Sequence, residues 1–211
     1  MKKSEITKKK ITKAAEAAFA DKGFFGSRVD EIASEAGVNK RMIYEHFGSK
    51  ENLYIAVLEE VYSKMADTEK ELLIREMNPV EAIKAVVSHY FSFLSENPAF
   101  IKTVMWENIN EAQFLKQSDA GRIKGTAMEE MAKKIRQGIK DGVFKEDCDP
   151  ELLVICINMF CFSCFSNVHT MAHIMNVDFT DKKILDGCRQ TVTDMILNHI
   201  CPDTQHKKEF A

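Results

Sequence analysis

The sequence lacks the features that mark a membrane-spanning, secreted or strand-rich protein. Its longest apolar run, from Leu152 to Phe165, is interrupted by Asn158 and Ser163. It is shorter than the segment of about 20 residues that crosses a bilayer. The basic start, MKKSEITKKK, is not followed by the apolar part of a signal peptide, and no stretch alternates long enough to predict a strand. We therefore expect a cytoplasmic, all-α protein that has no membrane partner.

Catalytic and cofactor-binding patterns are also missing. The chain has no phosphate-binding glycine loop, no nucleophile elbow and no pair of carboxylates with an evident role. Its six cysteines lie mostly within apolar helical patterns, which favours reduced, buried thiols over a disulfide framework. We expect a protein that is not an enzyme and that needs no cofactor.

One group of residues resembles a set of zinc ligands: Cys161, Cys164, His169 and His173. On one continuous helix, Cys164 is turned about 60° to one side of Cys161, while the two histidines are turned about 80° and 120° to the other. One ion cannot contact all four side chains, so we expect no metal site. The two histidines could at most form a two-ligand site at the surface.

The net charge of −3 hides a division along the chain. Residues 1–50 carry 11 Lys and Arg against 7 Asp and Glu, a net charge of +4, and the rest carries 18 against 25, a net charge of −7. A positive surplus at one end suits the neutralisation of nucleic-acid phosphates, and the acidic remainder discourages indiscriminate binding. The lysines near the start either track phosphates as a basic arm or simply aid solubility.

The stretch VDEIASEAGVNKRMIYEHF, residues 29–47, predicts two short helices joined by a tight turn. Gly37 suits the left-handed backbone that ends the first helix, and Asn39 is a good N-cap for the second. This is the spacing of a helix-turn-helix. On the second helix Ile43 and Phe47 share one face and can anchor it to a core, which leaves a polar face of the width that a major groove admits.

The residues from Gly23 to Leu53 resemble the DNA-binding head of the TetR family of bacterial transcriptional regulators, with the pattern IA…AGV…IY.HF..K..L. The resemblance covers roughly the first 55 residues. It implies that Lys40, Arg41, Met42 and Tyr44 face bases or the adjoining backbone, that His46 and Lys50 hold phosphates, and that Ser27 and Arg28 lie beside the same groove. Glu45 departs from the commoner pattern. It could accept a hydrogen bond from a cytosine amino group or point into water.

The remaining patterns are helical. We expect a first helix that stops at Gly23, a long helix from Lys50 to about Glu76 capped by Ser49, and helices that begin at Pro79 and Pro98. Further helices are expected from the Gly121–Gly125 region to Gly142, from Pro150 to about Asn176, and from Asp181 to His199. This gives about nine helices. Residues 1–50 form the three-helix head, 51–200 a helical regulatory, ligand-binding and dimerisation body, and 201–211 a tail.

The body is rich in Met and Phe, which either fill the core or line an adaptable apolar cavity. The candidate ligand-binding residues are His89, Phe93, Met105, Trp106, Asn108, Phe114, Met128, Met131, Met159 and Phe162. The two closing helices are apolar on more than one face. In the family resemblance they pair with their copies across a two-fold axis to form a homodimer.

These observations favour a ligand-responsive transcriptional regulator, a repressor released from a palindromic DNA operator by a small lipophilic or aromatic molecule. A homodimer presents two reading helices about 34 Å apart, the repeat of the major groove. Two alternatives stay open: an all-helical enzyme acting on an apolar substrate, and a constitutive DNA-binding protein without an inducer.

Overall fold

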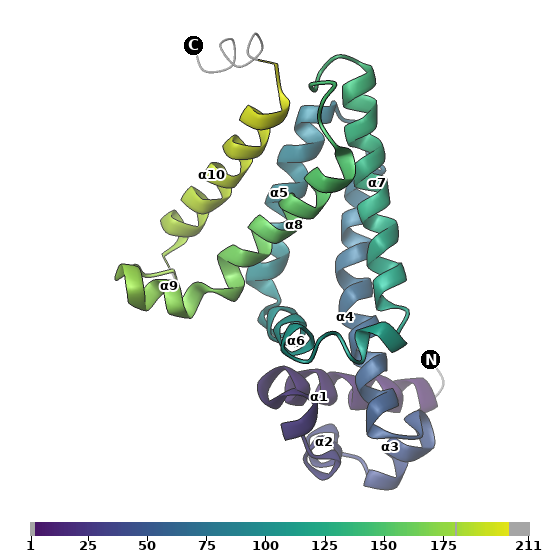
Figure 1. Ribbon diagram of the computed structural model, residues 1–211. Coiled ribbons are helices and arrows are strands. Elements are labelled where there is room, and N and C mark those ends of the chain that lie inside the picture. Colours follow the sequence, from purple (N-terminus) through teal and green to yellow (C-terminus); the bar gives the residue numbers. More distant parts are fainter. Residues whose placement is uncertain (1–2, 180, 203–211) are drawn as a thin grey trace. The chain divides into compact units, whose positions relative to one another are not determined.

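The computed structural model describes residues 3–179 and 181–202. Within these residues the chain forms ten α-helices, one 3-10 turn and no strand, which confirms the all-α prediction (Figure 1). The helices are α1 (Lys3–Gly26), α2 (Val29–Ala36), α3 (Lys40–Phe47), α4 (Lys50–Leu73), α5 (Pro79–Glu96), α6 (Pro98–Ile109), η1 (Leu115–Gln117), α7 (Ala120–Lys140), α8 (Pro150–Ser166), α9 (Val168–Met175) and α10 (Lys182–Ile200). They form two compact units, Met1–Met65 with Asn97–Lys124 and Ala66–Glu96 with Gly125–Ala211.

The first unit is built around a cluster of aromatic rings. The ring of Tyr54 on α4 meets Phe19 of α1 edge-on, with 4.8 Å between centroids, and Phe114 at 5.1 Å. Phe24 lies 4.3 Å from Phe114. All four are buried, and tilted or edge-to-face pairs of this kind add to the free energy gained by burial. The cluster joins the first and fourth helices to the segment that follows α6.

The predicted stop of the first helix at Gly23 is wrong in one respect. Gly23 does adopt a left-handed φ of 67°, but helical structure resumes after this kink and continues to Gly26. A Cβ at Gly23 would lie 2.8 Å from the indole ring of Trp106, whose Nε1 donates to the Ala20 carbonyl at 3.2 Å. Glycine is therefore required both by its backbone and by the close approach of α6.

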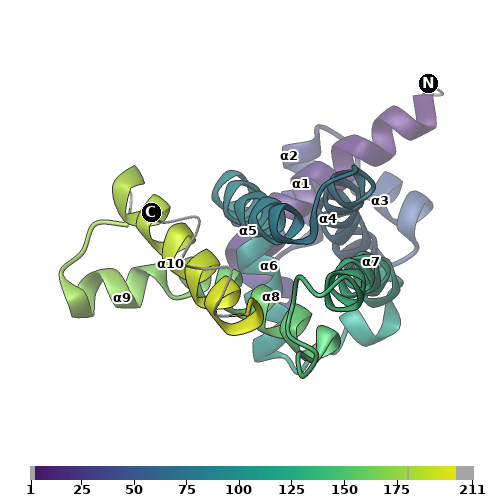
Figure 2. The same cartoon turned by 90° about the horizontal axis from the view of Figure 1, so that it is seen from above.

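The second unit places α5 against α8 and α10 (Figure 2). Its core contains Val86, Val87 and Leu94 from α5 and Ile157 from α8. The Tyr90 hydroxyl is buried in the same core and donates to the Glu69 carboxylate at 3.0 Å. Desolvation, followed by the charge of Glu69, holds the pKa of Tyr90 well above its ordinary value, so the phenol stays protonated as the donor.

The single closing helix expected from Pro150 to Asn176 is in fact two helices. α8 ends at Ser166, and α9 starts after Asn167 with a bend of 64°. The Asn167 amide donates to the carbonyl oxygen and to Oγ of Ser163, at 3.3 and 3.1 Å. The Asn167 backbone itself has φ −102° and ψ 7°, which interrupts the helix. Local side-chain bonds of this kind accompany helix ends and turns, and apolar periodicity does not reveal them. This break accounts for the tenth helix of the described residues, where about nine were expected.

Two smaller expectations also change. Gly121 and Gly125 lie inside α7 rather than before it, and α4 ends at Leu73 rather than near Glu76. Other boundaries are confirmed: Pro79, Pro98 and Pro150 each begin a helix, and the Asp181 carboxylate caps α10 by accepting from the Lys183 amide.

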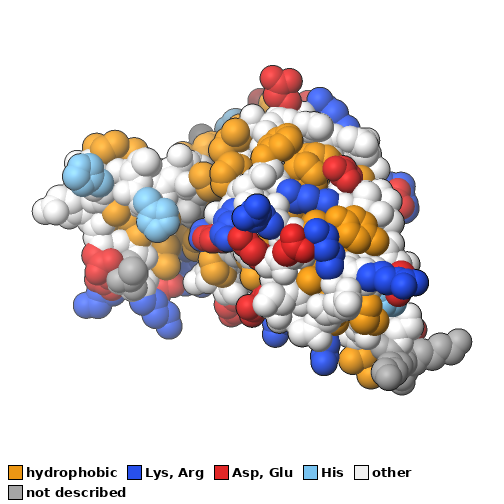
Figure 3. All heavy atoms as spheres, turned by 90° about the horizontal axis from the view of Figure 1, so that it is seen from below, with side chains coloured by type: hydrophobic (Ala, Val, Ile, Leu, Met, Phe, Trp, Pro, Cys, Tyr) orange, Lys and Arg blue, Asp and Glu red, His pale blue; other side chains and the backbone are white. Residues whose placement is uncertain are grey.

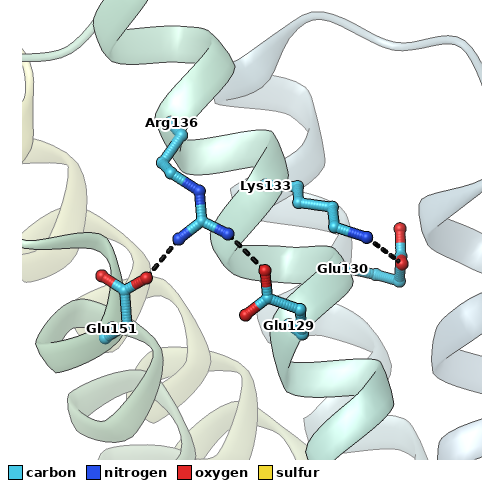
Figure 4. Close-up of polar contacts among 5 residues, drawn as sticks. All are labelled: Glu129, Glu130, Lys133, Arg136 and Glu151. Carbon is cyan, nitrogen blue, oxygen red and sulfur yellow. Dashed lines mark hydrogen bonds and ion pairs between the residues drawn. The ribbon is translucent and has the colours of Figure 1, made fainter.

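An exposed ion-pair network joins α7 to α8 in the second unit (Figure 4). Arg136 contacts Glu129 on its own helix and Glu151 at the start of α8, and Lys133 pairs with Glu130 at 2.7 Å. Exposed pairs of this kind stabilise a fold only slightly, so the network contributes little to the packing of the two helices.

Among the described residues, no single helix has both the length and the apolar composition of a membrane span. α8 and α9 meet that test only when taken together as a bent pair.

Candidate nucleic-acid interface

The turn between α2 and α3 has the predicted geometry. Gly37 adopts φ 63° and ψ 38°, and its amide donates to the Ser34 carbonyl at 3.1 Å, which ends α2. Asn39 is extended, and its Oδ1 accepts from the Arg41 amide at 2.9 Å, which caps α3. Ser49 Oγ then accepts from the Asn52 amide at 3.1 Å and caps α4. Three local caps therefore fix the three helix ends that position α3.

One face of α3 is buried and the other is free. Ile43 and Phe47 are 0% and 8% exposed, whereas Tyr44 is 43% exposed. Burying each anchor contributes about 1.5–3 kcal/mol, so α3 is held by apolar packing. Its polar side chains are not needed to keep it in place and are available to a ligand.

The cations of α3 are already paired with carboxylates inside the first unit. Lys40 Nζ lies 2.9 Å from Asp30, and this hydrogen bond raises the pKa of Lys40. Arg41 Nε lies 2.7 Å from Glu45 one turn further on, although the Arg41 side chain is 84% exposed. Glu45 therefore holds Arg41. The i,i+4 spacing could have predicted this second pair, but nothing in the sequence predicts the Lys40–Asp30 pair, because its members lie on different helices.

The face of the protein drawn in Figure 3 also carries charges of both signs. Lys and Arg side chains alternate with Asp and Glu side chains rather than forming one continuous basic field (Figure 3). Lys22 and Glu31 make a third such pair at 2.6 Å. A phosphate that approaches this surface would have to compete with these carboxylates for the Lys and Arg side chains.

Ser27 differs from the other predicted DNA-contacting residues. Ser27 is 3% exposed, and its hydroxyl donates to the Gly23 carbonyl at 2.7 Å and to the Ala18 carbonyl at 2.9 Å. The side chain ties the end of α1 to the start of α2, where the exposed Arg28 is the residue before the first helical turn. Ser27 is thus placed to fix the backbone of α2 rather than to present a donor.

The remaining predicted contacts lie at the edges of α3. Met42 and His46 are half-buried, as is Lys50 in the first turn of α4. Lys50 Nζ lies over the Phe24 ring, 4.5 Å from its centroid, and burial lowers the pKa of Lys50. A cation held over an aromatic ring keeps its charge in a fixed position.

The ten candidate ligand-binding residues do not lie in one compact unit. Met105, Trp106, Asn108 and Phe114 belong to the first unit, and the other six belong to the second. Phe93, Phe114 and Met131 are buried, whereas Met105, Asn108 and Met159 are exposed. Three of them have identified polar partners. His89 Nε2 lies 3.2 Å from Thr68 Oγ1, Asn108 donates to the Val104 carbonyl, and Trp106 Nε1 donates to the Ala20 carbonyl.

The second unit contains a hollow of about 380 Å³ where α8, α9 and α10 meet, and none of the ten residues lines it. Periodicity did not single out this place, because its shape depends on the bend at Asn167. Within the described part of the chain, no three His, Cys, Asp or Glu side chains come close enough to hold a metal ion. The sequence-based argument against zinc assumed one continuous helix, however, and that assumption is wrong because the cysteines lie on α8 and the histidines on α9.

Two family models match the chain. Residues 11–57 match the family described as bacterial regulatory proteins, tetR family, and residues 79–196 match the tetracyclin repressor-like, C-terminal domain. The HTH-type transcriptional repressor NicS of Pseudomonas putida is 30% identical over 195 residues, which cover 92% of each chain. The HTH-type transcriptional regulator RutR of Escherichia coli is 30% identical over 150 residues, 71% of this chain and 69% of RutR.

Solved structures share the fold. A TetR transcriptional regulator from Chloroflexus aurantiacus has a TM-score of 0.76 at 19% identity, covering 95% of this chain and 99% of its own. AibR, crystallised with isovaleryl coenzyme A and operator DNA, has a TM-score of 0.70 at 16% identity. The match covers 90% of this chain and 97% of the AibR chain.

Proposed function

Because the chain belongs to the TetR family of bacterial transcriptional regulators, we propose that it is a ligand-responsive repressor that binds a palindromic operator as a homodimer. The observation that carries this proposal is the geometry of α3, which is anchored by two buried apolar residues and presents Arg41 and Tyr44 outward. As a regulator of bacterial transcription it acts where the chromosome lies, in the cytoplasm. We assign DNA binding to residues 1–50 and ligand binding and dimerisation to 51–200. Of the predicted tail, 201–211, residues 203–211 lie outside the described part of the chain.

The proposed DNA contacts follow from exposure and reach. Lys40, Arg41, Met42 and Tyr44 read bases or the neighbouring backbone, and His46, Lys50 and Arg28 contact phosphates, with Ser27 fixing the backbone beside them. Phosphate contacts position such a helix, and base contacts give it sequence specificity.

Selection from a random duplex library tests this assignment. The wild-type chain should enrich one palindromic sequence. Tyr44→Ala or Arg41→Ala should weaken binding to that sequence about tenfold or more, because a good contact to a base discriminates by about 1–3 kcal/mol. Lys133→Ala removes a positive charge from an exposed side chain of α7 and serves as the matched control for Arg41→Ala. Unchanged discrimination between the selected and random duplexes in both α3 variants contradicts the assignment.

Glu45 offers a more specific test of the same surface. Its carboxylate holds Arg41 at 2.7 Å, so Glu45→Gln removes a charge that repels phosphates and frees the guanidinium. We expect tighter binding to random DNA and therefore a smaller ratio of specific to non-specific affinity. A loss of affinity for the selected sequence alone would instead make Glu45 a base-reading residue, as for a contact to a cytosine amino group.

The proposed dimer uses the outward faces of α8 and α10. Leu152, Ile155, Met159 and Phe160 on α8 and Met195 on α10 are 43–65% exposed, and contiguous apolar surface of this kind marks association sites. Met159→Arg should convert the dimer to a monomer in sedimentation experiments and weaken operator binding. Ile74→Arg, at a residue that is 72% exposed just beyond α4, is the control. A Met159→Arg variant that remains a dimer removes α8 from the interface.

The effector is proposed to be a small lipophilic or aromatic molecule. The candidate contacts are His89, Phe93, Met105, Trp106, Asn108, Phe114, Met128, Met131, Met159 and Phe162, and AibR, with its coenzyme A ester and operator, shows that this fold can hold both kinds of partner. A preference of a few kcal/mol for the non-binding state is sufficient, since each 1.4 kcal/mol changes operator affinity tenfold. The test has two steps. Apolar compounds that raise the melting temperature of the protein are identified first, and each is then titrated into the protein–operator complex while operator binding is measured. A compound that binds without shifting DNA affinity would favour a constitutive DNA-binding protein.

A further inference from the structure

The hollow between α8, α9 and α10 has an unusual lining. Its apolar walls come from Phe160, Val168, Met171, Phe179, Val192 and Met195, and no charged side chain lines it. Two thiols, those of Cys164 on α8 and Cys188 on α10, open into the same space. Apolar pockets with a few convergent reactive or polar groups are typical binding sites for small molecules.

The two thiols are neighbours in space although 24 positions separate them in the sequence. Cys164 and Cys188 lie within hydrogen-bonding reach of each other, and burial, together with Cys188, raises the pKa of Cys164 to about 11. Both side chains are only half-buried. At neutral pH the Cys164 thiol is therefore protonated, which disfavours rapid attack on peroxides, because the thiolate is the nucleophile.

The chemistry of the lining restricts the ligand. An ion such as zinc needs about four ligands, and here two thiols are available without any carboxylate or imidazole in the lining. A bound species that stayed charged in this apolar space would lose solvation without a compensating partner. The site therefore suits a ligand with a soft, polarisable atom that forms two bonds to sulfur and gives an adduct without net charge.

We propose that Cys164 and Cys188 form a dithiol site for trivalent, monosubstituted arsenicals, with the organic substituent in the apolar hollow. The arsenical R–As=O forms two As–S bonds. Each thiol gives its proton to the oxygen, the As=O bond breaks, and the oxygen leaves as water. Arsenic remains trivalent, no oxidant is needed, and the product R–As(S–Cys)₂ carries no charge. Phe160 and Met195 line the hollow and also belong to the proposed dimer surface, but capture does not depend on the proposed DNA binding, because it is measured on protein without DNA.

Phenylarsine oxide is the probe, and native mass spectrometry of the reduced full-length protein is the measurement. We expect one phenylarsenic group per chain, which resists excess monothiol and is removed by a dithiol such as dimercaptopropanol. Cys164→Ser and Cys188→Ser should each reduce capture to background. Cys156→Ser, which changes a half-buried thiol on the same helix outside the hollow, should keep it.

A second measurement needs no variant. Bound phenylarsine oxide should protect Cys164 and Cys188 from alkylation and leave Cys148 and Cys156, both half-buried, as reactive as before. Capture that persists in either folded hollow variant, protection of any other pair, or the absence of a stable adduct in the wild-type protein overturns the proposal.

Discussion

Helices α3 and α8 differ in the side chains that they expose on the face directed away from the core. α3 buries Ile43 and Phe47 and leaves its other face to polar residues, whereas α8 buries Leu153, Val154 and Ile157 and still exposes large apolar side chains. A polar outer face suits a hydrated, charged partner, and an apolar outer face suits another protein surface. The side chains on the outward face of a helix therefore indicate the kind of partner that the helix suits. The buried side chains on its inward face indicate only that the helix packs against the core.

The largest expected effect tests the inward face of α3. Phe47→Ala should destabilise the first unit by about 3–5 kcal/mol, the usual cost of emptying a buried aromatic site. Trp106 is the only tryptophan in the sequence and contacts Gly23 of α1, so its fluorescence during urea denaturation reports this unit. Tyr44→Ala on the opposite face should change the midpoint little. Equal effects of the two variants would refute the division of α3 into two faces.

Two glycines of α7 within the second unit differ in how closely other residues approach them. A Cβ at Gly138 would lie 2.4 Å from the Phe144 ring and 2.8 Å from Pro79, whereas a Cβ at Gly125 would meet no atom within 4 Å. Gly138→Ala should therefore destabilise by about 1–3 kcal/mol through overpacking. Gly125→Ala should stabilise by about 0.5–1 kcal/mol, because glycine is a poor helix former. Thermal unfolding followed by circular dichroism distinguishes the two variants. Changes in melting temperature of the same sign for both would contradict the close packing at Gly138.

The caps that place α3 come next in magnitude. Asn39→Ala removes the acceptor for the Arg41 amide and should cost about 1 kcal/mol. Asn39→Asp keeps an acceptor and should restore most of that loss. Tryptophan fluorescence in urea measures both variants, and an alanine variant as stable as the wild type would mean that α3 does not depend on its cap.

The smallest expected effect concerns the ion pairs of α7 and α8. Glu151→Gln breaks the link to Arg136 shown in Figure 4 and should cost less than about 1 kcal/mol, with the loss shrinking as salt is added. The change in melting temperature at low and high salt measures it. A large effect that salt does not alter would mean that the pair is more than a surface contact.

Local signals predicted the helix-turn-helix well. Gly37, Asn39 and Ser49 each act on a backbone group only a few residues away, so their effect can be read without knowing the rest of the fold. The same holds for the prolines that begin α5, α6 and α8. Apolar periodicity added the buried face of α3, because Ile43 and Phe47 lie one turn apart.

The helix boundaries that were predicted wrongly and the contacts that were not predicted depend on interactions that sequence spacing does not encode. The bend lies at Asn167, whose backbone leaves the helical conformation while its side chain bonds to Ser163, and Gly23 is kinked where the Trp106 ring approaches it. The pairing of Lys40 with Asp30 and the meeting of Cys164 with Cys188 join different helices. Each requires the three-dimensional arrangement before the chemistry becomes visible.

The carboxylates beside Lys40 and Arg41 have a thermodynamic consequence for binding to a polyanion. A cation that already has an internal counter-charge displaces fewer condensed ions when it meets a phosphate, so the logarithm of the association constant should fall less steeply with the logarithm of salt concentration. Recognition would then draw less on the release of small ions and more on the match between side chains and base edges.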